Sequence, residues 1–166
     1  MPALACIEIE AAKRFLGTGL VDHLQDTSFD TASLKALIDC KQVWLACAED
    51  NTPVGFIVVS VRGSLAYLEE MDVLPAHGRR GIGARLVSAA KEWARDKGFD
   101  ALILSTFESI PWNVPFYKRL GFAVLPEERW SADMLHLRAE EQERGLPIDK
   151  RVIMKLELST GASQSF

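Results

Sequence analysis

The chain has 166 residues, of which 48% are hydrophobic and 25% are charged. This length suits one globular domain and is too short for two domains of ordinary size. Nineteen Lys and Arg residues against 23 Asp and Glu residues give a net charge of -4, so the overall field does not favour nucleic acid or an anionic membrane as a partner. Any site for an anion must therefore be local.

The three cysteines, Cys6, Cys40 and Cys47, are an odd number without the spacing of a metal site. Such usage is typical of a reduced cytoplasmic protein rather than a disulfide-linked one. The first residues lack the basic and apolar segments of a signal peptide, and no apolar run approaches the ~18 residues of a membrane span. The three histidines lie far apart in the sequence, so we expect no metal site.

The N-terminal region predicts one strand and two helices. Residues 4–9 have strand-forming side chains, and residues 11–24 have apolar side chains at helical spacing that Gly17 and Gly19 weaken. Asp30 or Thr31 caps a second expected helix that runs through residue 38.

Three runs of strand-forming residues follow, at 42–48, 54–62 and 65–73, with turn residues between them. They predict an antiparallel meander of three strands. Since side chains alternate along a strand, the third run has two expected faces. One face carries Leu65, Tyr67, Glu69, Met71 and Val73, and the other carries Ala66, Leu68, Glu70 and Asp72.

A Gly-Arg-Arg-Gly-Ile-Gly segment at residues 78–83 leads into an expected amphipathic helix that Gly98 ends. Backbone N–H groups at a glycine-rich turn and a helix N-terminus suit phosphate oxygens, and Arg79 and Arg80 add local positive charge. From the residues alone, an ordinary turn with two solvated arginines is an equal alternative. The segment is neither a Walker loop nor a dinucleotide loop, because Leu86 stands where the latter needs glycine.

The C-terminal half predicts a strand at 101–106, a short helix at 113–119, a strand at 122–125, a helix at 131–144 and a last strand at 151–158. No linker or repeat divides the chain. We therefore expect a single domain over residues 1–158 and a flexible tail over residues 159–166.

The order of meander, Gly/Arg turn, helix and strand, followed by the LSTFESIPWNVPFYKRLGF segment at residues 104–122, resembles the GNAT superfamily of acyl-CoA-dependent N-acetyltransferases. The resemblance is close over residues 40–125. It implies an α/β fold with a mixed, mostly antiparallel sheet flanked by helices. It also implies direct transfer of the acetyl group of acetyl-CoA to a primary amine of a small molecule or peptide. One departure is Gly78, where the family pattern begins with Arg or Gln.

The resemblance also implies a set of cofactor contacts. In the family, an Asn at the position of Asn113 commonly contacts the coenzyme, and a Tyr at the position of Tyr117 lies near the thioester sulfur. From the residues alone, Asn113 could instead cap its helix and Tyr117 could pack in the core. The implied contacts are Met71, Val73, Gly78, Arg79, Arg80, Gly81, Ile82, Gly83, Ala84, Asn113 and Tyr117.

Transfer to an amine needs a base, because an ammonium group of the lysine type has a pKa of ~10.4. Glu69 is the first candidate and Glu70 the alternative. Adjacent strand residues face opposite ways, so only one faces the cleft unless a bulge intervenes. We expect Tyr117 to protonate the departing thiolate and a backbone N–H of residues 71–73, freed by a broken ladder there, to polarise the carbonyl. A cysteine intermediate is disfavoured, since no basic group stands beside Cys40 or Cys47.

The acceptor site is the least defined. By resemblance, the early helices and the last hairpin wall the acceptor cleft, which nominates Phe29, Trp112 and Trp130, although each could equally be core. An acidic rim over residues 127–144 would attract a cationic amine, but arginines dilute its field. An exposed apolar last strand would allow a homodimer, as is common in the superfamily. The competing function is a non-catalytic acyl-CoA binding or sensing module.

Overall fold

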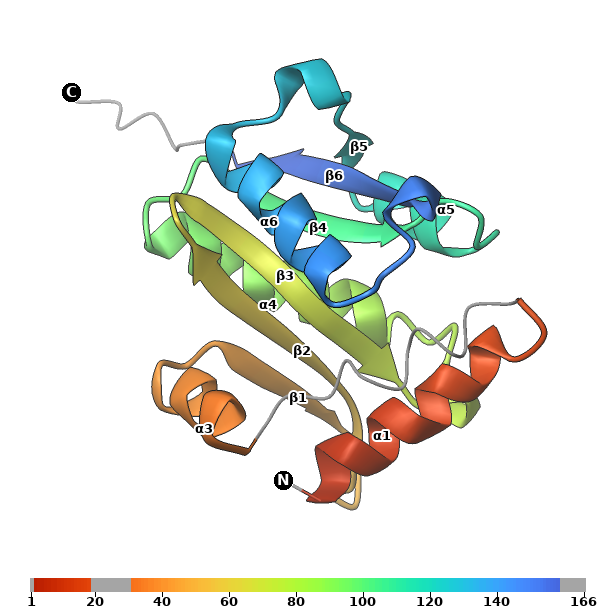
Figure 1. Cartoon of the computed structure of the whole chain (residues 1–166). Coiled ribbons are helices and arrows are strands. Elements are labelled where there is room, and N and C mark those ends of the chain that lie inside the picture. Colours follow the sequence, from red (N-terminus) through yellow and green to blue (C-terminus); the bar gives the residue numbers. More distant parts are fainter. Residues whose placement is uncertain (1, 19–30, 159–166) are drawn as a thin grey trace.

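The computed structural model describes residues 2–18 and 31–158 (Figure 1). The strands are β1 (Val43–Cys47), β2 (Pro53–Arg62), β3 (Leu65–Val73), β4 (Ala101–Phe107), β5 (Ala123–Val124) and β6 (Arg151–Glu157). The helices are α1 (Pro2–Ala12), α3 (Thr31–Asp39), α4 (Ile82–Asp96), α5 (Asn113–Arg119) and α6 (Ala132–Glu143). Short 3-10 turns occur at Lys13–Phe15, Pro75–His77, Glu127–Arg129 and Ile148–Lys150.

The strands form one six-stranded sheet in the order β1-β2-β3-β4-β6-β5. Only the central pair, β3 and β4, is parallel, and the other pairs are antiparallel. Helix α4 covers one face of the sheet, and α1, α3 and α6 lie against the other (Figure 1). The expected mixed, mostly antiparallel α/β fold is confirmed.

Each face of the sheet buries its own apolar cluster. The apolar stripe of α4, which includes Leu86 and Ala90, packs on Ile57, Leu68 and Leu104 of the strands. On the opposite face, α6 and α1 pack against separate clusters of strand residues. The stripe explains why α4 forms where the sequence predicts it, because its burial repeats at the helical period.

The expected first strand is wrong, since residues 4–9 belong to helix α1. Leu4, Ile7 and Ala11 are buried at helical spacing, and the first two pack with Phe56 and Val58 of β2. Packing against the sheet therefore outweighs the strand propensity of a short segment. The expected helix at 11–24 is also wrong in the described part, where α1 ends at Ala12 and a 3-10 turn follows. Residues 19–30 lie outside the described residues.

The remaining expected elements are confirmed, with ends that differ by a residue or two. The meander of β1, β2 and β3 is antiparallel as predicted. The last strand differs in one respect. Its apolar residues Ile153, Met154 and Leu156 are buried, and β6 lies between β4 and β5. The apolar residues of the last strand, through which a homodimer could form if they were exposed, are therefore buried.

Strand β3 contains a bulge at Glu69. Val58 of β2 lies opposite Glu70, and Val59 lies opposite Leu68, so Glu69 has no partner of its own. The extra residue reverses the alternation. Leu68, Met71 and Val73 pack on the α4 side, whereas Glu69 and Glu70 line the same cavity. The simple two-face assignment of residues 65–73 is therefore wrong from Glu70 onward.

The two central strands separate beyond their first residues. Pairing between β3 and β4 covers only Ala66–Leu68 and Leu102–Leu104. From there β4 continues along β6 to Phe107, while β3 continues along β2 to Val73. Figure 1 shows the two strands diverging. Among the strands of the described residues, none pairs with the edges that face each other across this opening.

No helix in the described ranges is long and apolar enough to cross a membrane.

Candidate functional site

Two cavities meet where β3 and β4 separate. One has a volume of about 530 Å³ and is lined by the Gly/Arg turn, so we call it the turn cavity. The other, of about 700 Å³, contains Glu69, Glu70 and Asp72 and is called the carboxylate cavity. Both cavities are lined by Phe15, Met71, Asp72, Asn113 and Tyr117. These shared residues mark the junction at which a molecule in one cavity would touch a molecule in the other.

The turn cavity is built for an anion. Gly81 precedes α4 with a φ of 75°, and no side chain caps the helix. The first N–H groups of α4 therefore have no internal partner and can bind phosphate oxygens. Glycine at position 81 permits this left-handed conformation at little cost. Arg79, with a φ of 58°, adds positive charge at the same turn.

Of the cofactor contacts that the sequence predicts, all but Arg80 line the turn cavity. The same cavity is lined by Arg14 and Arg119, which the sequence analysis did not identify. Arg14 lies in the 3-10 turn after α1, and Arg119 ends α5. No local motif marks either residue, because only the fold brings these two segments to the Gly/Arg turn.

Backbone donors of β3 face the opening between the strands. Leu74 N donates to Val54 O at 2.9 Å, toward β2. Because the direction of the N–H groups alternates along a strand, those of Met71 and Val73 point away from β2, toward the diverged β4. Strand pairing is thus interrupted at these residues, as the sequence predicts, but a bulge at residues 71–73 is not the cause. The bulge lies at Glu69, and the divergence of β4 leaves these donors without a partner strand.

Helix α5 positions two polar side chains at the junction. Asn113 Nδ2 donates to Thr106 Oγ1 of β4 at 3.0 Å, so the Asn113 side chain does not cap its helix. Tyr117 packs edge-on between Phe116 and Phe122, with ring centroids 5.1 and 5.6 Å apart. Burial raises the pKa of the Tyr117 phenol well above its usual value near 10. The phenol is therefore a proton donor at any ordinary pH.

Glu69 is held in an ion pair within the carboxylate cavity. Its Oε1 accepts hydrogen bonds from Ser60 Oγ at 2.5 Å and from Arg62 Nε at 2.7 Å. Arg62 Nη2 lies 2.6 Å from the same oxygen, and the Glu69 side chain is only 7% exposed. These contacts hold the Glu69 carboxylate against the β2 wall of the cavity.

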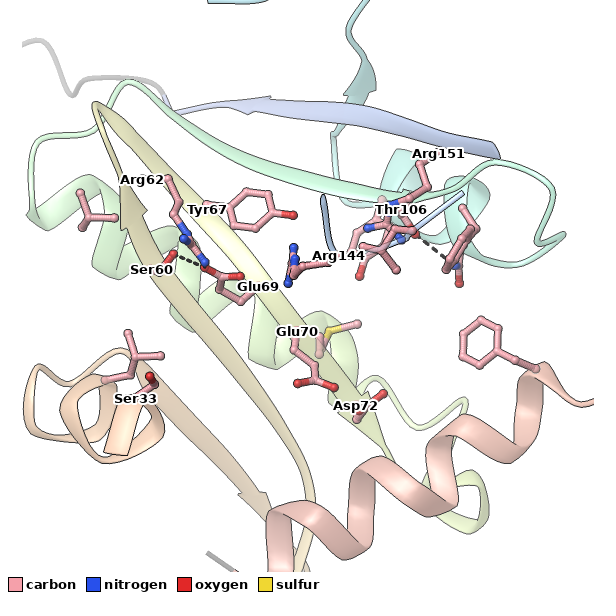
Figure 2. A pocket seen from close by; sticks show the side chains of 18 of the residues that line it. Ser33, Ser60, Arg62, Tyr67, Glu69, Glu70, Asp72, Thr106, Arg144 and Arg151 are labelled. Carbon is pink, nitrogen blue, oxygen red and sulfur yellow. Dashed lines mark hydrogen bonds and ion pairs between the residues drawn. The ribbon is translucent and has the colours of Figure 1, made fainter. Parts of the chain in front are cut away.

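Glu70 and Asp72 form a second, different arrangement in the same cavity, shown in Figure 2. Burial and the neighbouring Asp72 charge raise the pKa of Glu70 far above its usual range. Burial also raises the pKa of Asp72, against a hydrogen bond from Glu70 that lowers it. The two carboxyl groups therefore share one proton under conditions in which isolated carboxylates are ionised.

Asp72 was missed as a site residue by the sequence analysis. It lines both cavities, whereas Glu69 and Glu70 line only one. The signal was present as a third acidic residue on the same strand. The assumed alternation separated Asp72 from Glu69, and only the bulge places all three carboxylates in one cavity.

The three aromatic residues proposed for the acceptor differ in position. Trp112 lines the turn cavity, with its ring centroid 6.0 Å from that of Phe15. Trp130 lines neither cavity, and its Nε1 donates to Leu125 O at 2.9 Å. The structure therefore does not bring Trp130 to the site. Phe29 lies outside the described residues.

Metal ligands do not gather at this site. Within residues 2–18 and 31–158, no group of three or more His, Cys, Asp and Glu side chains is arranged to hold a metal ion.

The chain was compared with known families and proteins. The model of the acetyltransferase (GNAT) family matches residues 10–122. The aminoglycoside N(6')-acetyltransferase type 1 of Klebsiella aerogenes is 39% identical over 64 residues, which are 34% of this chain and 42% of that protein. The uncharacterized N-acetyltransferase YjcF of Bacillus subtilis is 31% identical over 91 residues, which are 54% of this chain and 63% of that protein. The matched segments thus span less than two thirds of either relative.

Among solved structures, the ribosomal-protein-S18-alanine N-acetyltransferase from Escherichia coli superposes with a TM-score of 0.61 at 16% identity. The superposition covers 99% of this chain and 92% of that one, so the two share a fold. The family model spans most of the chain, including the Gly/Arg turn, α5 and the separated strands. The chain therefore belongs to the acetyltransferase (GNAT) family.

Proposed function

We propose that this protein transfers the acetyl group of acetyl-CoA directly to a primary amine of a small molecule or peptide. The observation that carries the proposal is the meeting of the two cavities at Asp72, Asn113 and Tyr117. One cavity offers anion-binding groups and the other offers carboxylates, which suits a phosphate-bearing donor and a cationic acceptor. Family membership supports the same donor.

In this proposal the pyrophosphate of acetyl-CoA binds the N–H groups at the start of α4, with Arg79 beside it and Arg14 and Arg119 as further cations. The acetyl end reaches the opening between β3 and β4. There an N–H of Met71 or Val73 donates a hydrogen bond to the carbonyl oxygen. The remaining contacts are the lining residues Gly78, Gly81, Ile82, Gly83, Ala84 and Asn113.

The proton transfers follow from the junction residues. The Asp72–Glu70 pair accepts a proton from the ammonium group of the acceptor, because Asp72 borders both cavities and the pair has a raised pKa. The amine nitrogen then bonds to the acetyl carbon as the carbon–sulfur bond breaks. Tyr117 donates its proton to the departing sulfur and takes up the second proton that the nitrogen loses as the amide forms. The overall reaction releases one proton to solvent from the ammonium acceptor.

Glu69 was the first sequence candidate for the base, with Glu70 as the alternative. The ion pair with Arg62 assigns Glu69 a positioning role in this proposal, since it fixes the wall of the carboxylate cavity. Glu70 remains in the base through its contact with Asp72. Catalysis as proposed needs no metal ion and no cysteine intermediate.

Calorimetry and a turnover assay test the function together. CoA, acetyl-CoA and ATP are titrated into the protein, and thiol release is then followed with polyamines, aminoglycosides, amino acids and peptides. Binding of acetyl-CoA with thiol release on at least one amine supports the proposal. Tight CoA binding without turnover on any amine would favour a non-catalytic acyl-CoA binding module. Binding of ATP without CoA would overturn the donor assignment.

We also propose that the enzyme acts in the cytoplasm. Cys6, Cys40 and Cys47 are unpaired, as expected in a reducing compartment. Fractionation of cells that express the tagged chain measures this directly, and recovery in a secreted or membrane fraction would contradict it.

A further inference from the structure

The carboxylate cavity is lined by three arginines, and they differ in what they contact. They are Arg62 of β2, Arg144 at the end of α6 and Arg151 of β6. Three guanidinium groups are unexpected in a cavity that would receive only a cationic amine, because like charges repel at short range. Their partners show which of them can bind a ligand.

Two of the three guanidinium groups already have carboxylate partners. Arg62 pairs with Glu69, as described above, and also lies 3.4 Å from Glu140. Arg151 donates from Nε and Nη2 to Glu141 Oε1 at 3.2 and 3.0 Å. Its Nη2 also donates to Ser105 O at 3.0 Å. These two arginines are part of the wall.

Arg144 is different. In the part of the chain that the structure describes, its guanidinium makes no hydrogen bond and no ion pair with a carboxylate. Figure 2 shows the guanidinium pointing into the cavity rather than away from it. Arg144 is an exposed residue whose guanidinium borders the cavity without a carboxylate partner, so it is available to bind a ligand carboxylate.

A second polar group without a partner lies beside Arg144. Tyr67 is only 3% exposed, lines the same cavity and interacts electrostatically with Arg144. Among the described residues its hydroxyl has no hydrogen-bond partner, and Figure 2 shows it directed toward the Arg144 side of the cavity. The Tyr67 ring is buried while its hydroxyl faces the cavity, so the hydroxyl can donate a hydrogen bond to an acceptor atom of a ligand.

The cavity therefore has two charged regions of opposite sign. Asp72, next to Glu70 on β3, borders the junction with the turn cavity, whereas Arg144 and Tyr67 line the carboxylate cavity alone. We infer that the acceptor is an amino carboxylate, an amino acid or a peptide with a free carboxylate, whose amine faces Asp72 and whose carboxylate binds Arg144 and Tyr67. The inference rests on the proposed function, because it names the acceptor class of that same site.

This charge arrangement also distinguishes acceptors that have a carboxylate from acceptors that lack one. The carboxylate of the acceptor satisfies two donors that are otherwise unpaired, whereas the same molecule without it leaves them unpaired. A polyamine brings a second positive charge toward Arg144 and is repelled. The structure thus favours amino acids and peptides over simple amines and polycations.

Matched acceptor pairs test the inference in the full-length protein. Lysine is compared with cadaverine, tyrosine with tyramine, and a dipeptide with its C-terminal amide, by thiol release from acetyl-CoA. We expect the carboxylate form to have a kcat/KM higher by about 10-fold or more. Arg144→Gln should reduce that ratio to about 1, and Tyr67→Phe should reduce it by about 3-fold, without a change in the KM for acetyl-CoA.

Arg129→Gln is the matched control, because Arg129 is exposed and lines neither cavity. This variant should leave unchanged the ratio between the kcat/KM of each carboxylate acceptor and that of its matched amine. Turnover of cadaverine, tyramine or aminoglycosides at rates equal to or above those of the amino carboxylates would overturn the inference and leave the proposed function standing. An unchanged ratio in Arg144→Gln would also overturn it. Absence of thiol release with every amine would instead overturn the proposed function, and the inference with it.

Discussion

Glu70 and Asp72 lie on one face of β3 and line the same cavity, where each carboxyl group shifts the pKa of the other. They are two residues apart on the strand, so the pleat directs both to the same side. Both are half-buried, and Glu8 of α1 adds a further negative charge. One proton held between two carboxylates lowers the cost of burying them and leaves a base of raised pKa at the junction of the cavities.

The pair makes stability depend on pH in a defined direction. The pKa of each carboxyl group is higher in the folded protein than in the unfolded chain. Stability is therefore fully present below the unfolded pKa, near ~4, and falls as pH rises toward the folded pKa, because the native state then holds a proton that the unfolded chain has released. Between pH 5 and pH 8 the free energy of unfolding should fall in both proteins. The fall in Glu70→Gln should be smaller than in the wild type by at least about 1 kcal/mol.

Urea unfolding at the two pH values measures this difference. Glu49→Gln is the control, since Glu49 is exposed, and its pH dependence should match that of the wild type. Identical pH dependence in Glu70→Gln and wild type would show that the pair does not carry a raised pKa.

Asp72→Asn should remove the base while the cavity keeps its shape. We expect kcat to fall by about 100-fold or more, with little change in the affinity for acetyl-CoA. In the wild type, the acidic limb of the kcat/KM profile should have an apparent pKa above the usual range for a carboxylate. This limb should be absent from the profile of the variant. Glu69→Gln serves as the comparison, since its partner is Arg62. A loss of the limb in Glu69→Gln alone would reassign the base to Glu69.

Tyr117→Phe should lower kcat by about 100-fold, because the departing thiolate loses its proton donor. Calorimetric affinity for CoA should change little, since the ring and its packing against Phe116 and Phe122 remain. The basic limb of the pH profile should not report Tyr117, whose pKa is raised by burial. An unchanged rate in the variant would exclude Tyr117 as the acid.

Gly83→Ala should narrow the turn cavity. A Cβ at this position would lie in ordinary contact with Met71 Cε, at 3.5 Å, but only 3.1 Å from Phe116 Cζ, so the Phe116 ring must move slightly. We expect a weaker affinity for CoA, by about 10-fold, and a loss of about 1 kcal/mol in the free energy of unfolding. Ser88→Ala, on the exposed side of the same helix, is the control. Equal CoA affinity in both variants would show that Phe116 does not limit the cavity.

Glu141→Gln should destabilise the protein strongly. Glu141 is fully buried, accepts two hydrogen bonds from Arg151, and its Oε2 lies 3.0 Å from Arg138 Nη1. Loss of this charge leaves two guanidinium groups without their carboxylate, at a cost of about 3 kcal/mol. Urea unfolding measures it, with the exposed Glu143→Gln as a control that should change stability by less than about 0.5 kcal/mol. A small effect at Glu141 would mean that solvent reaches the two arginines.

Features that depend on neighbouring residues were predictable from the sequence. The Gly/Arg turn, α4 and α5 follow from glycine positions and helical spacing within short segments. Residues 4–9 were misread because a six-residue window cannot show the burial of Ala11, which completes the helical face. Short apolar runs fit a strand or a helix equally well, and the sheet decides between them.

The functional site was only partly predictable, because its geometry depends on contacts between strands. The bulge at Glu69 is a property of the register of β3 against β2, which no local pattern encodes. The sequence places Tyr67 on an expected strand and Arg144 at the end of the expected helix at 131–144. The fold places both in one cavity. Trp130 shows the opposite case, since an aromatic residue nominated for the acceptor site packs in the core instead.

The three-residue ladder between β3 and β4 is the only strand pairing that joins the two halves of the sheet in the described part of the chain. The first half, β1 to β3, holds the carboxylates, and the second half supplies Tyr117 and Arg144. A small rotation about this joint would change the distances between the proposed base Asp72, the proposed acid Tyr117 and Arg144 at the same time. Residues that pack across it, such as Leu68 and Leu104, thereby set the working geometry of a reaction that they do not touch.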